Sequence, residues 1–330
     1  MSVEEGFQSS AKVSVVIVTW NHRDDLPKCL EALFAQTYSF IDVTIVDNAS
    51  QDGSAEWVKE FAPHTNLIPL ESNQGFSRAF NLGARAADGE FILSLNPDVC
   101  ARPDFIANMM AAVQKDPRIG TVAPKLLRAD DIKFLDSTGL FINRQRRPYD
   151  RGQMQLDLGQ YDKNTEIFGA CGAAALYRRC MLEDLAVNEE YFDEDFFAYY
   201  EDADLAWRAK LRGWRCVYSA QAVGEHVRGW GDTLRKRPTY KGNGPRLALR
   251  NHMLMITKNE SASSFLRDAP LIFLTGIPRL FYMVIFRRDA LKGITDFFRL
   301  APKAIKKRKI IQGSRMVKDR DLQRWFYHYD

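Results

Sequence analysis

The chain has 330 residues, of which 46% are apolar and 27% are charged, which are globular values that allow a sizeable core. This length accommodates two domains, or one large α/β domain with an extension. Five cysteines are odd in number and show no C-x-x-C spacing, so we expect reduced core thiols and exclude a disulfide framework or zinc site. The polar residues 1–11 lack the apolar segment of a signal peptide, and we expect a flexible N-terminus on a cytoplasmic protein.

The net charge of +4 conceals an uneven distribution. Residues 264–330 hold 15 Lys and Arg against 6 Asp and Glu, whereas residues 1–263 hold 31 against 36. The tail also contains Pro270–Phe286, which is apolar apart from Arg279 and, at 17 residues, short for a membrane-spanning helix. We expect an interfacial segment on an anionic cytoplasmic membrane surface. The alternative is a helical subdomain packed on the core. The basic residues match no nucleic-acid-binding module.

In chain order, β-branched and apolar runs predict strands at 13–18, 43–46, 66–70 and 90–95. Helices are predicted at 24–36, from 52–54 onward, and at 76–87. This alternation favours a doubly wound, mostly parallel sheet flanked by helices, with the carboxyl ends of the strands along one edge. Ligands of such sheets bind at that edge. The polar residues that follow the strands are Thr19, Asn21, Asp47, Asn48, Asn73, Asn96 and Asp98.

The middle of the chain is less regular. A helix is predicted at 103–115, a strand at 119–123, and long loops or a hairpin over 130–165. Small residues over 167–177 predict a strand where the backbone approaches another group closely. A helix opening with the carboxylates of Glu201–Asp204 and a strand at 214–218 follow, and His226 lies shortly after that strand.

Six motifs occur in a fixed order: Val15–Asn21, Val46–Ser50 with Asp52-Gly53, Asn73–Phe76, Leu95–Asp98, Glu201–Asp204 and His226. The ordered set, over about residues 12–262, resembles inverting family 2 glycosyltransferases with the GT-A fold. It is most similar to the bacterial rhamnosyltransferases that use dTDP-L-rhamnose. The resemblance implies an α/β GT-A domain at 12–262, with a nucleotide-sugar half (12–100) and an acceptor half (101–262). A helical basic and apolar extension would occupy 263–330.

The resemblance implies a metal site for Mg²⁺ or Mn²⁺ at Asp98 and His226. Oxygen ligands suit these cations, which neutralise the charge that develops on a leaving nucleotide diphosphate. Asn96 departs from the family's Asp-x-Asp pattern and leaves one carboxylate where two are usual. Asn96-Pro97-Asp98 is also good turn chemistry without a metal. The segment 227–231 is expected to close over the donor phosphates.

The resemblance also places the general base at the second acid, Asp202. Neighbouring helical residues point about 100° apart, so Glu201 and Asp202 cannot both face the site. We expect Glu201 to position the acceptor or to support Asp202, and we expect the helix N-terminus to favour an ionised base. The alternative is an ordinary acidic first helical turn.

Donor recognition is expected at the other strand ends. There is no G-x-G-x-x-G, so the phosphate fingerprint of a dinucleotide oxidoreductase is absent from the sequence. The expected nucleotide-sugar-binding residues are Thr19, Trp20, Asn21, Asp47, Asn48, Ser50, Asn73, Gly75, Phe76, Arg78, Asn96 and Pro97.

These features favour transfer of L-rhamnose from dTDP-L-rhamnose to a lipid-linked or oligosaccharide acceptor in cell-surface glycan synthesis, at the inner face of the plasma membrane. One alternative is transfer of galactofuranose or an N-acetylhexosamine from a UDP donor. A second is a non-catalytic sugar-nucleotide-binding subunit, to which only Asn96 points. A nucleotidyltransferase would need a Gly-rich phosphate loop, and Thr19–Asp24 contains no glycine. The sequence leaves the oligomeric state open.

Overall fold

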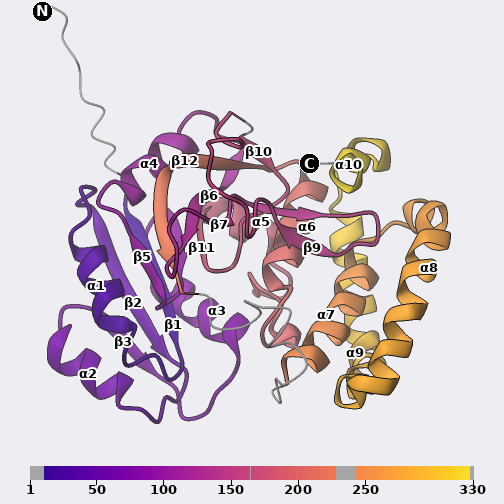
Figure 1. Ribbon diagram of the computed structural model, residues 1–330, viewed down its shortest axis with the longest axis horizontal. Coiled ribbons are helices and arrows are strands. Elements are labelled where there is room, and N and C mark those ends of the chain that lie inside the picture. The colour runs from indigo at the N-terminus through magenta and orange to yellow at the C-terminus, as the bar shows by residue number, and fades with distance from the viewer. Residues whose placement is uncertain (1–10, 164, 228–242, 328–330) are drawn as a thin grey trace, which may run out of the picture.

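The computed structural model describes residues 11–163, 165–227 and 243–327 (Figure 1). The predicted flexible N-terminus and most of the predicted phosphate-covering segment therefore lie outside the described residues. The first part of the chain alternates strands and helices as the sequence predicts. Its elements are β1 (Val13–Thr19), α1 (Leu26–Phe34), β2 (Ile41–Asp47), α2 (Ser54–Phe61), β3 (Asn66–Pro69), α3 (Phe76–Ala86) and β4 (Phe91–Leu95).

The middle of the chain adds short strands and two strands that are longer than the sequence indicates. The predicted 119–123 strand runs on to residue 128, and the predicted 214–218 strand runs on to residue 226. The elements are β5 (Val99–Ala101), α4 (Phe105–Val113), β6 (Ile119–Arg128), β7 (Leu135–Ser137), β8 (Leu140–Ile142), β9 (Pro148–Asp150), β10 (Glu166–Ile167), β11 (Ala174–Arg178), α5 (Arg179–Leu185), the 3₁₀ helix η1 (Glu194–Phe196), α6 (Glu201–Arg212) and β12 (Arg215–His226).

The main sheet has the order β10-β12-β6-β11-β4-β1-β2-β3. Strands β4, β1, β2 and β3 run parallel to one another, and β12 runs parallel to β6. The strand β11 is antiparallel to both β4 and β6 and joins these two parts. Thr19 is in register with Asp47, and Asp47 with Pro69, so the parallel strands end along one edge as predicted. The predicted 167–177 strand is divided, since a loop separates β10 from β11.

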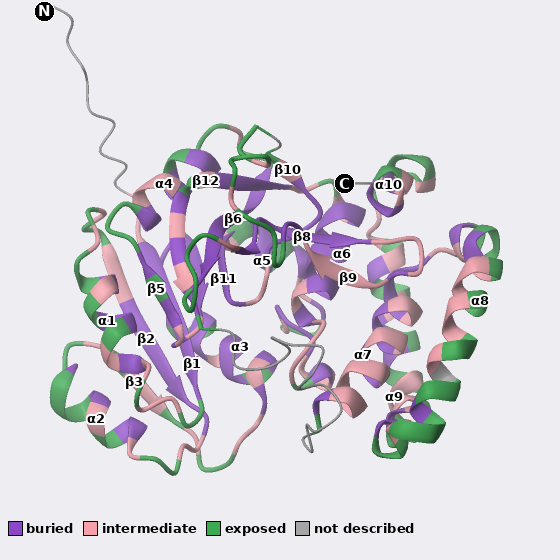
Figure 2. Cartoon of the chain, viewed as in Figure 1, coloured by how far each residue is buried: buried purple, intermediate pink, exposed green. Residues whose placement is uncertain are grey.

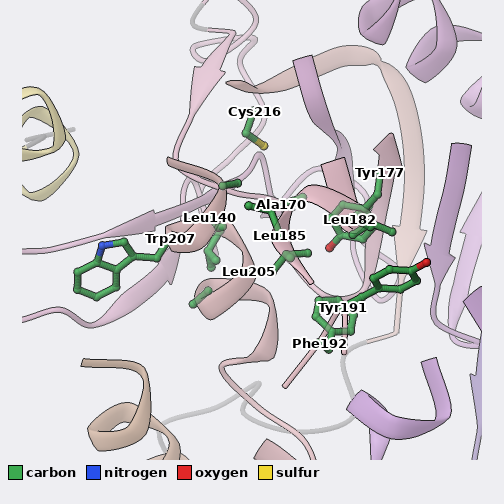
Figure 3. Packing of buried hydrophobic residues seen from close by; sticks show 14 of the residues in the cluster. Leu140, Ala170, Tyr177, Leu182, Leu185, Tyr191, Phe192, Leu205, Trp207 and Cys216 are labelled. Carbon is green, nitrogen blue, oxygen red and sulfur yellow. The ribbon is translucent and has the colours of Figure 1, made fainter. Parts of the chain in front are cut away.

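Alternate residues of the central strands pack on opposite faces of the sheet. Val15 and Ile17 join a cluster with α1, α2 and α4, whereas Val16 and Val18 join a cluster with α3, α5 and α6. Figure 3 shows part of the second cluster, including Trp207 from α6. No disulfide joins the five cysteines, all of which are described. Cys29 and Cys216 are buried, as expected for core thiols, but Cys100 and Cys180 are exposed, which that expectation did not include.

Four helices follow: α7 (Gly244–Asn259), α8 (Ala262–Phe286), α9 (Arg288–Gly313) and α10 (Asp319–Phe326). In Figure 1, α7, α8 and α9 stack beside one another, away from the parallel strands. The helix α10 places Phe326 on Trp207, with ring centroids 5.3 Å apart, so part of the tail packs on the core.

The helix α8 is mostly exposed (Figure 2). It is 25 residues long, because it begins well before the apolar run that starts at Pro270. Within the described part of the chain it is the one helix that length and composition would allow to cross a membrane. Its most apolar 18-residue window has a mean hydropathy of 1.7 and is 6% buried.

Candidate functional site

The loops after β1 and β2 are tied together at the expected donor edge. The backbone N–H of Asn48 donates to the carbonyl oxygen of Thr19 (2.8 Å). Asn21 has φ of 59° and donates its N–H to Ser50 Oγ (2.9 Å). Ser50 in turn donates its N–H to Asp47 Oδ2 (3.1 Å). These bonds bring five of the expected donor-binding residues together in one compact corner, at the shared strand edge that the sequence predicts.

The loop before α3 continues this corner. Asn48 Oδ1 accepts the N–H of Gln74 (2.8 Å), and Asn73 Oδ1 accepts the N–H of Gly75 (2.9 Å). Gly75 has φ of 84°, a left-handed value that favours glycine, and an added Cβ would lie 2.5 Å from the carbonyl oxygen of Phe197. The donor corner therefore contacts the segment that leads into α6.

Three other expected donor residues have different surroundings. The Trp20 side chain is 53% exposed beside the corner. Phe76 packs into the core, with its ring 6.0 Å from that of Phe192. Arg78 lies near Glu194, with 3.8 Å between its Nε and the carboxylate Oε2. The structure thus gives Phe76 a packing contact and Arg78 an ion pair.

Asp98 and His226 are brought together by short strands. The strand β5, which follows Asp98 directly, pairs antiparallel with the end of β12, so that Val99 is opposite His226. The N–H of Val227 also donates to the carbonyl oxygen of Asp98 (3.0 Å). As a result, His226 Nε2 lies 3.5 Å from Asp98 Oδ2, and both side chains are largely buried.

Asp136 on β7 is a third member of this group. Its Oδ2 lies 2.8 Å from His226 Nδ1, and its side chain is buried. Burial alone lowers the pKa of His226, but hydrogen bonds with Asp136 and Asp98 outweigh burial and raise that pKa to about 9. A cation at Nε2 would therefore have to displace a proton, as metal binding to histidine requires.

This arrangement fits a divalent cation in two respects. The Nδ1 contact with Asp136 is the orienting bond that metal-binding histidines usually make, and it leaves Nε2 facing Asp98. Asp98 Oδ1 is buried, and no described residue forms a hydrogen bond with it. On the other hand, no group of three or more His, Cys, Asp or Glu side chains that could hold a metal ion occurs among the described residues, so the candidate ligands are Asp98 and His226 alone. The protein would thus supply two ligands and leave positions open for water or phosphate oxygens.

Asp202 is held at the start of α6 by backbone donors. Its Oδ2 accepts the N–H of Gly172 (2.9 Å), and its Oδ1 accepts the N–H of Ala203 (2.7 Å). Burial raises its pKa to about 6, and although the Ala203 bond acts in the opposite direction, the charge of Asp150 adds to the rise. The expected preference for ionisation at the helix N-terminus is therefore outweighed by the surroundings. A pKa near neutrality suits a general base.

Glu201 is more deeply buried than Asp202. Its side chain is buried, and its Oε2 has no hydrogen-bond partner among the described residues. Burial, followed by the nearby charge of Asp202, raises the pKa of Glu201 to about 8. The raised pKa favours the protonated form of Glu201, and a protonated carboxyl group can donate a hydrogen bond.

The Asp98 turn and the Asp202 carboxylate are joined through one short segment. The N–H of Asn96 donates to the carbonyl oxygen of Ala173 (2.8 Å), and the preceding residue, Gly172, donates to Asp202. The small residues of this segment permit the approach, since a Cβ on Gly172 would lie 3.4 Å from Asp202 Oδ2. The expected metal side and the expected base are therefore neighbours.

Two structurally important acids were missed by sequence reasoning. Asp136 lies in a polar stretch that showed no pattern, and only its contact with His226 reveals it. Asp204 is fully buried and ties α6 to α7 through Lys258 (2.9 Å) and Asn259 (2.7 Å). Asp204 therefore has a structural role, and the motif Glu201–Asp204 alone does not distinguish this acid from the two site candidates before it.

Comparison with known proteins gives a family. The sequence model described as Glycosyl transferase family 2 matches residues 14–186. The N-acetylglucosaminyl-diphospho-decaprenol L-rhamnosyltransferase of Mycobacterium tuberculosis is 28% identical over 235 residues, which are 63% of this chain and 73% of that protein. The poly-beta-1,6-N-acetyl-D-glucosamine synthase of Staphylococcus aureus is 22% identical over 215 residues, 64% of this chain and 48% of that protein.

Solved structures show the same fold. TarS (residues 1–349) of Staphylococcus aureus in complex with UDP-GlcNAc has a TM-score of 0.57 at 16% identity, covering 97% of this chain and 94% of that one. The mannosyltransferase PcManGT of Pyrobaculum calidifontis, in complex with GDP-Man and Mn²⁺, has a TM-score of 0.53 at 18% identity, covering 91% and 74%.

Proposed function

Because the chain belongs to glycosyl transferase family 2 and has the GT-A fold, we propose that it is an inverting transferase that moves L-rhamnose from dTDP-L-rhamnose to a lipid-linked glycan. The donor and acceptor are supported by the 28% identical rhamnosyltransferase, whose name specifies a diphospho-decaprenol-linked substrate.

The donor nucleotide would lie on the corner formed after β1, β2 and β3. Two buried oxygens there, Thr19 Oγ1 and Asp47 Oδ1, have no hydrogen-bond partner among the described residues. Buried polar atoms are normally paired, so these two are suited to bind a base or ribose. The exposed ring of Trp20 lies at the edge of the same corner.

The transfer step would use Asp202 as general base. Its carboxylate takes the proton of the acceptor hydroxyl while that oxygen attacks the anomeric carbon of the donor sugar. The bond from this carbon to the nucleotide diphosphate breaks on the opposite face, and dTDP leaves with the bonding electron pair. Glu201, neutral at pH 7, would donate a hydrogen bond that positions the acceptor.

A divalent cation, Mg²⁺ or Mn²⁺, would be held by Asp98 and His226, with Asp136 orienting the imidazole. When bound, it neutralises the charge that develops on the leaving diphosphate. The mannosyltransferase of the same fold was crystallised with Mn²⁺, which supports a divalent cation here.

The observation that carries this proposal is the pair of contacts through Gly172 and Ala173, which makes Asp202 a neighbour of the Asp98 turn. The test is product inhibition by dTDP, UDP and GDP, together with turnover of dTDP-L-rhamnose and of UDP- and GDP-sugars by the purified protein with Mn²⁺. We expect selective turnover of dTDP-L-rhamnose and strongest inhibition by dTDP. Selective turnover of a UDP-sugar would overturn the rhamnose assignment while leaving the reaction type.

We also propose that the protein binds the inner face of the plasma membrane through α8. Five of its exposed apolar residues share one face of the helix. These are Phe273, Leu274, Ile277, Phe281 and Ile285, and close to the end of the helix Tyr282, Val284 and Phe286 are exposed as well. Positively charged side chains of α9 follow, and these attract anionic lipids.

Substitution tests this better than truncation, because α10 packs on the core. Phe273→Gln with Phe281→Gln should release the protein from phosphatidylglycerol vesicles in a flotation assay. Phe298→Gln removes an equally exposed ring from α9 and serves as the matched control. Equal flotation of both variants and the wild type would contradict the membrane proposal.

A further inference from the structure

Two arginines near Tyr200, the residue before α6, have no acidic partner among the described residues. Arg147 directly precedes β9 in the β8–β9 hairpin. Arg279 is the single charged residue within the apolar part of α8. By contrast, the hairpin's Arg144 and Arg146 both form ion pairs with Asp268, at 3.0 and 2.9 Å. Arg147 Nε is buried and has no hydrogen-bond partner in the described structure.

The two arginines meet at Tyr200, the residue that precedes Glu201. Arg279 donates a hydrogen bond to the Tyr200 hydroxyl, and both arginines act electrostatically on that group. The Tyr200 ring lies 5.6 Å from the ring of His252, whose Nε2 is 2.9 Å from the carbonyl oxygen of Arg146. These contacts hold the hairpin, α7 and α8 around one point at the start of α6.

The cluster carries two positive charges, and no carboxylate in the described part of the chain forms an ion pair with either of them. Burial lowers the pKa of His252 to about 4, with a further contribution from Arg279, so His252 adds no charge at pH 7. Burial, then the charge of Arg279, also lowers the pKa of Arg147. Partly buried cations without a counter-ion are costly, and arginine binds phosphate through paired N–H groups. The cluster therefore suits a phosphate supplied by a ligand.

The position of the cluster indicates which ligand carries this phosphate. The donor diphosphate belongs at Asp98, across the short Gly172 segment from the base. Arg279 lies three residues before Tyr282 and seven before Phe286, so it shares a side of α8 with these two exposed rings, whose centroids are 5.1 Å apart. A molecule with a phosphate at Arg279 and a hydrocarbon chain along α8 is a lipid phosphate. Given the function proposed above, on which this inference rests, that molecule is the acceptor.

We propose that Arg147 and Arg279, with the Tyr200 hydroxyl, bind the diphosphate of the lipid-linked acceptor and so deliver its terminal sugar to Asp202. The probe is farnesyl diphosphate, with farnesol as the phosphate-free comparison, in calorimetric binding to the full chain. Arg147→Gln and Arg279→Gln should each weaken binding of farnesyl diphosphate about tenfold, as expected for loss of a charged hydrogen-bonding partner. Neither should change binding of farnesol.

Controls separate this site from its alternatives. Arg288→Gln removes an exposed charge just beyond α8 and should leave binding of farnesyl diphosphate unchanged. Binding of dTDP with Mn²⁺ should be the same in all variants, which reports both folding and the donor site. Equal affinity of the wild type and both cluster variants for farnesyl diphosphate would overturn the acceptor site. Unchanged dTDP binding by the same variants would leave the proposed function standing in that case. Parallel loss of binding to phosphatidylglycerol vesicles would also overturn it, since it would assign the arginines to bilayer headgroups.

Discussion

The buried Glu201 gives a pH-dependent stability that can be calculated. Its pKa rises from 4.5 to about 8 on folding, because burial and the neighbouring Asp202 disfavour the charged form. Between these values the folded state holds more protons than the unfolded state, so the free energy of unfolding falls as the pH rises. At about pH 7.5 the cost is on the order of 4 kcal/mol, from about 1.36 kcal/mol for each pH unit above the unfolded pKa.

Glu201→Gln removes this cost and keeps the side-chain shape. We expect the variant to be more stable than the wild type by about 4 kcal/mol at about pH 7.5, and by less than about 1 kcal/mol at about pH 5. Urea denaturation at both pH values measures the difference. Glu56→Gln is the matched control, since Glu56 is an exposed acid in the first turn of α2. A stability difference that is the same at both pH values would refute a neutral, buried Glu201.

Two further predictions concern the cation and the donor corner. Asp136→Asn removes the carboxylate that orients His226. The Mn²⁺ concentration for half-maximal activity should therefore rise about 10–100-fold, and activity should recover at high Mn²⁺. An unchanged Mn²⁺ dependence would show that Asp136 does not orient a metal-binding His226. Gly75→Ala should lower stability by about 2 kcal/mol and raise the donor KM, because its Cβ would clash with the Phe197 carbonyl at a positive φ. Gly53→Ala has the same positive φ with nothing within 4 Å, so equal losses in denaturation of the two variants would contradict the clash.

The parallel part of the sheet was predictable because its strands are short, apolar and followed by polar residues. Right-handed strand–helix–strand connections make such strands parallel, and this alone places their carboxyl ends along one edge. The contacts of Thr19 with Asn48 and of Asp47 with Ser50 follow from that edge. The proximity of Asp98 and Asp202 was predicted only through the family resemblance, because about a hundred residues and an antiparallel strand separate them.

Other parts depend on long-range pairing that no local pattern encodes. The strand β12 extends to His226 because β5 pairs with its end, and β5 is only three residues long. Asp136 lies on an equally short strand. The length of α8 was underestimated because Pro270 suggested a beginning, although the helix continues through it and through Pro278. Arg279 was visible as an isolated charge, but only its bond to Tyr200 shows its direction.

The most direct test of the account is the rate of dTDP release from dTDP-L-rhamnose, with Mn²⁺ and a lipid-linked acceptor, for the wild type and Asp202→Asn. The account predicts that the wild type requires the cation and forms a rhamnoside of inverted anomeric configuration. Asp202→Asn should bind dTDP normally and turn over about 10²–10⁴-fold more slowly. Wild-type turnover in Asp202→Asn, or a product that retains the donor configuration, would contradict Asp202 as the base of a single displacement.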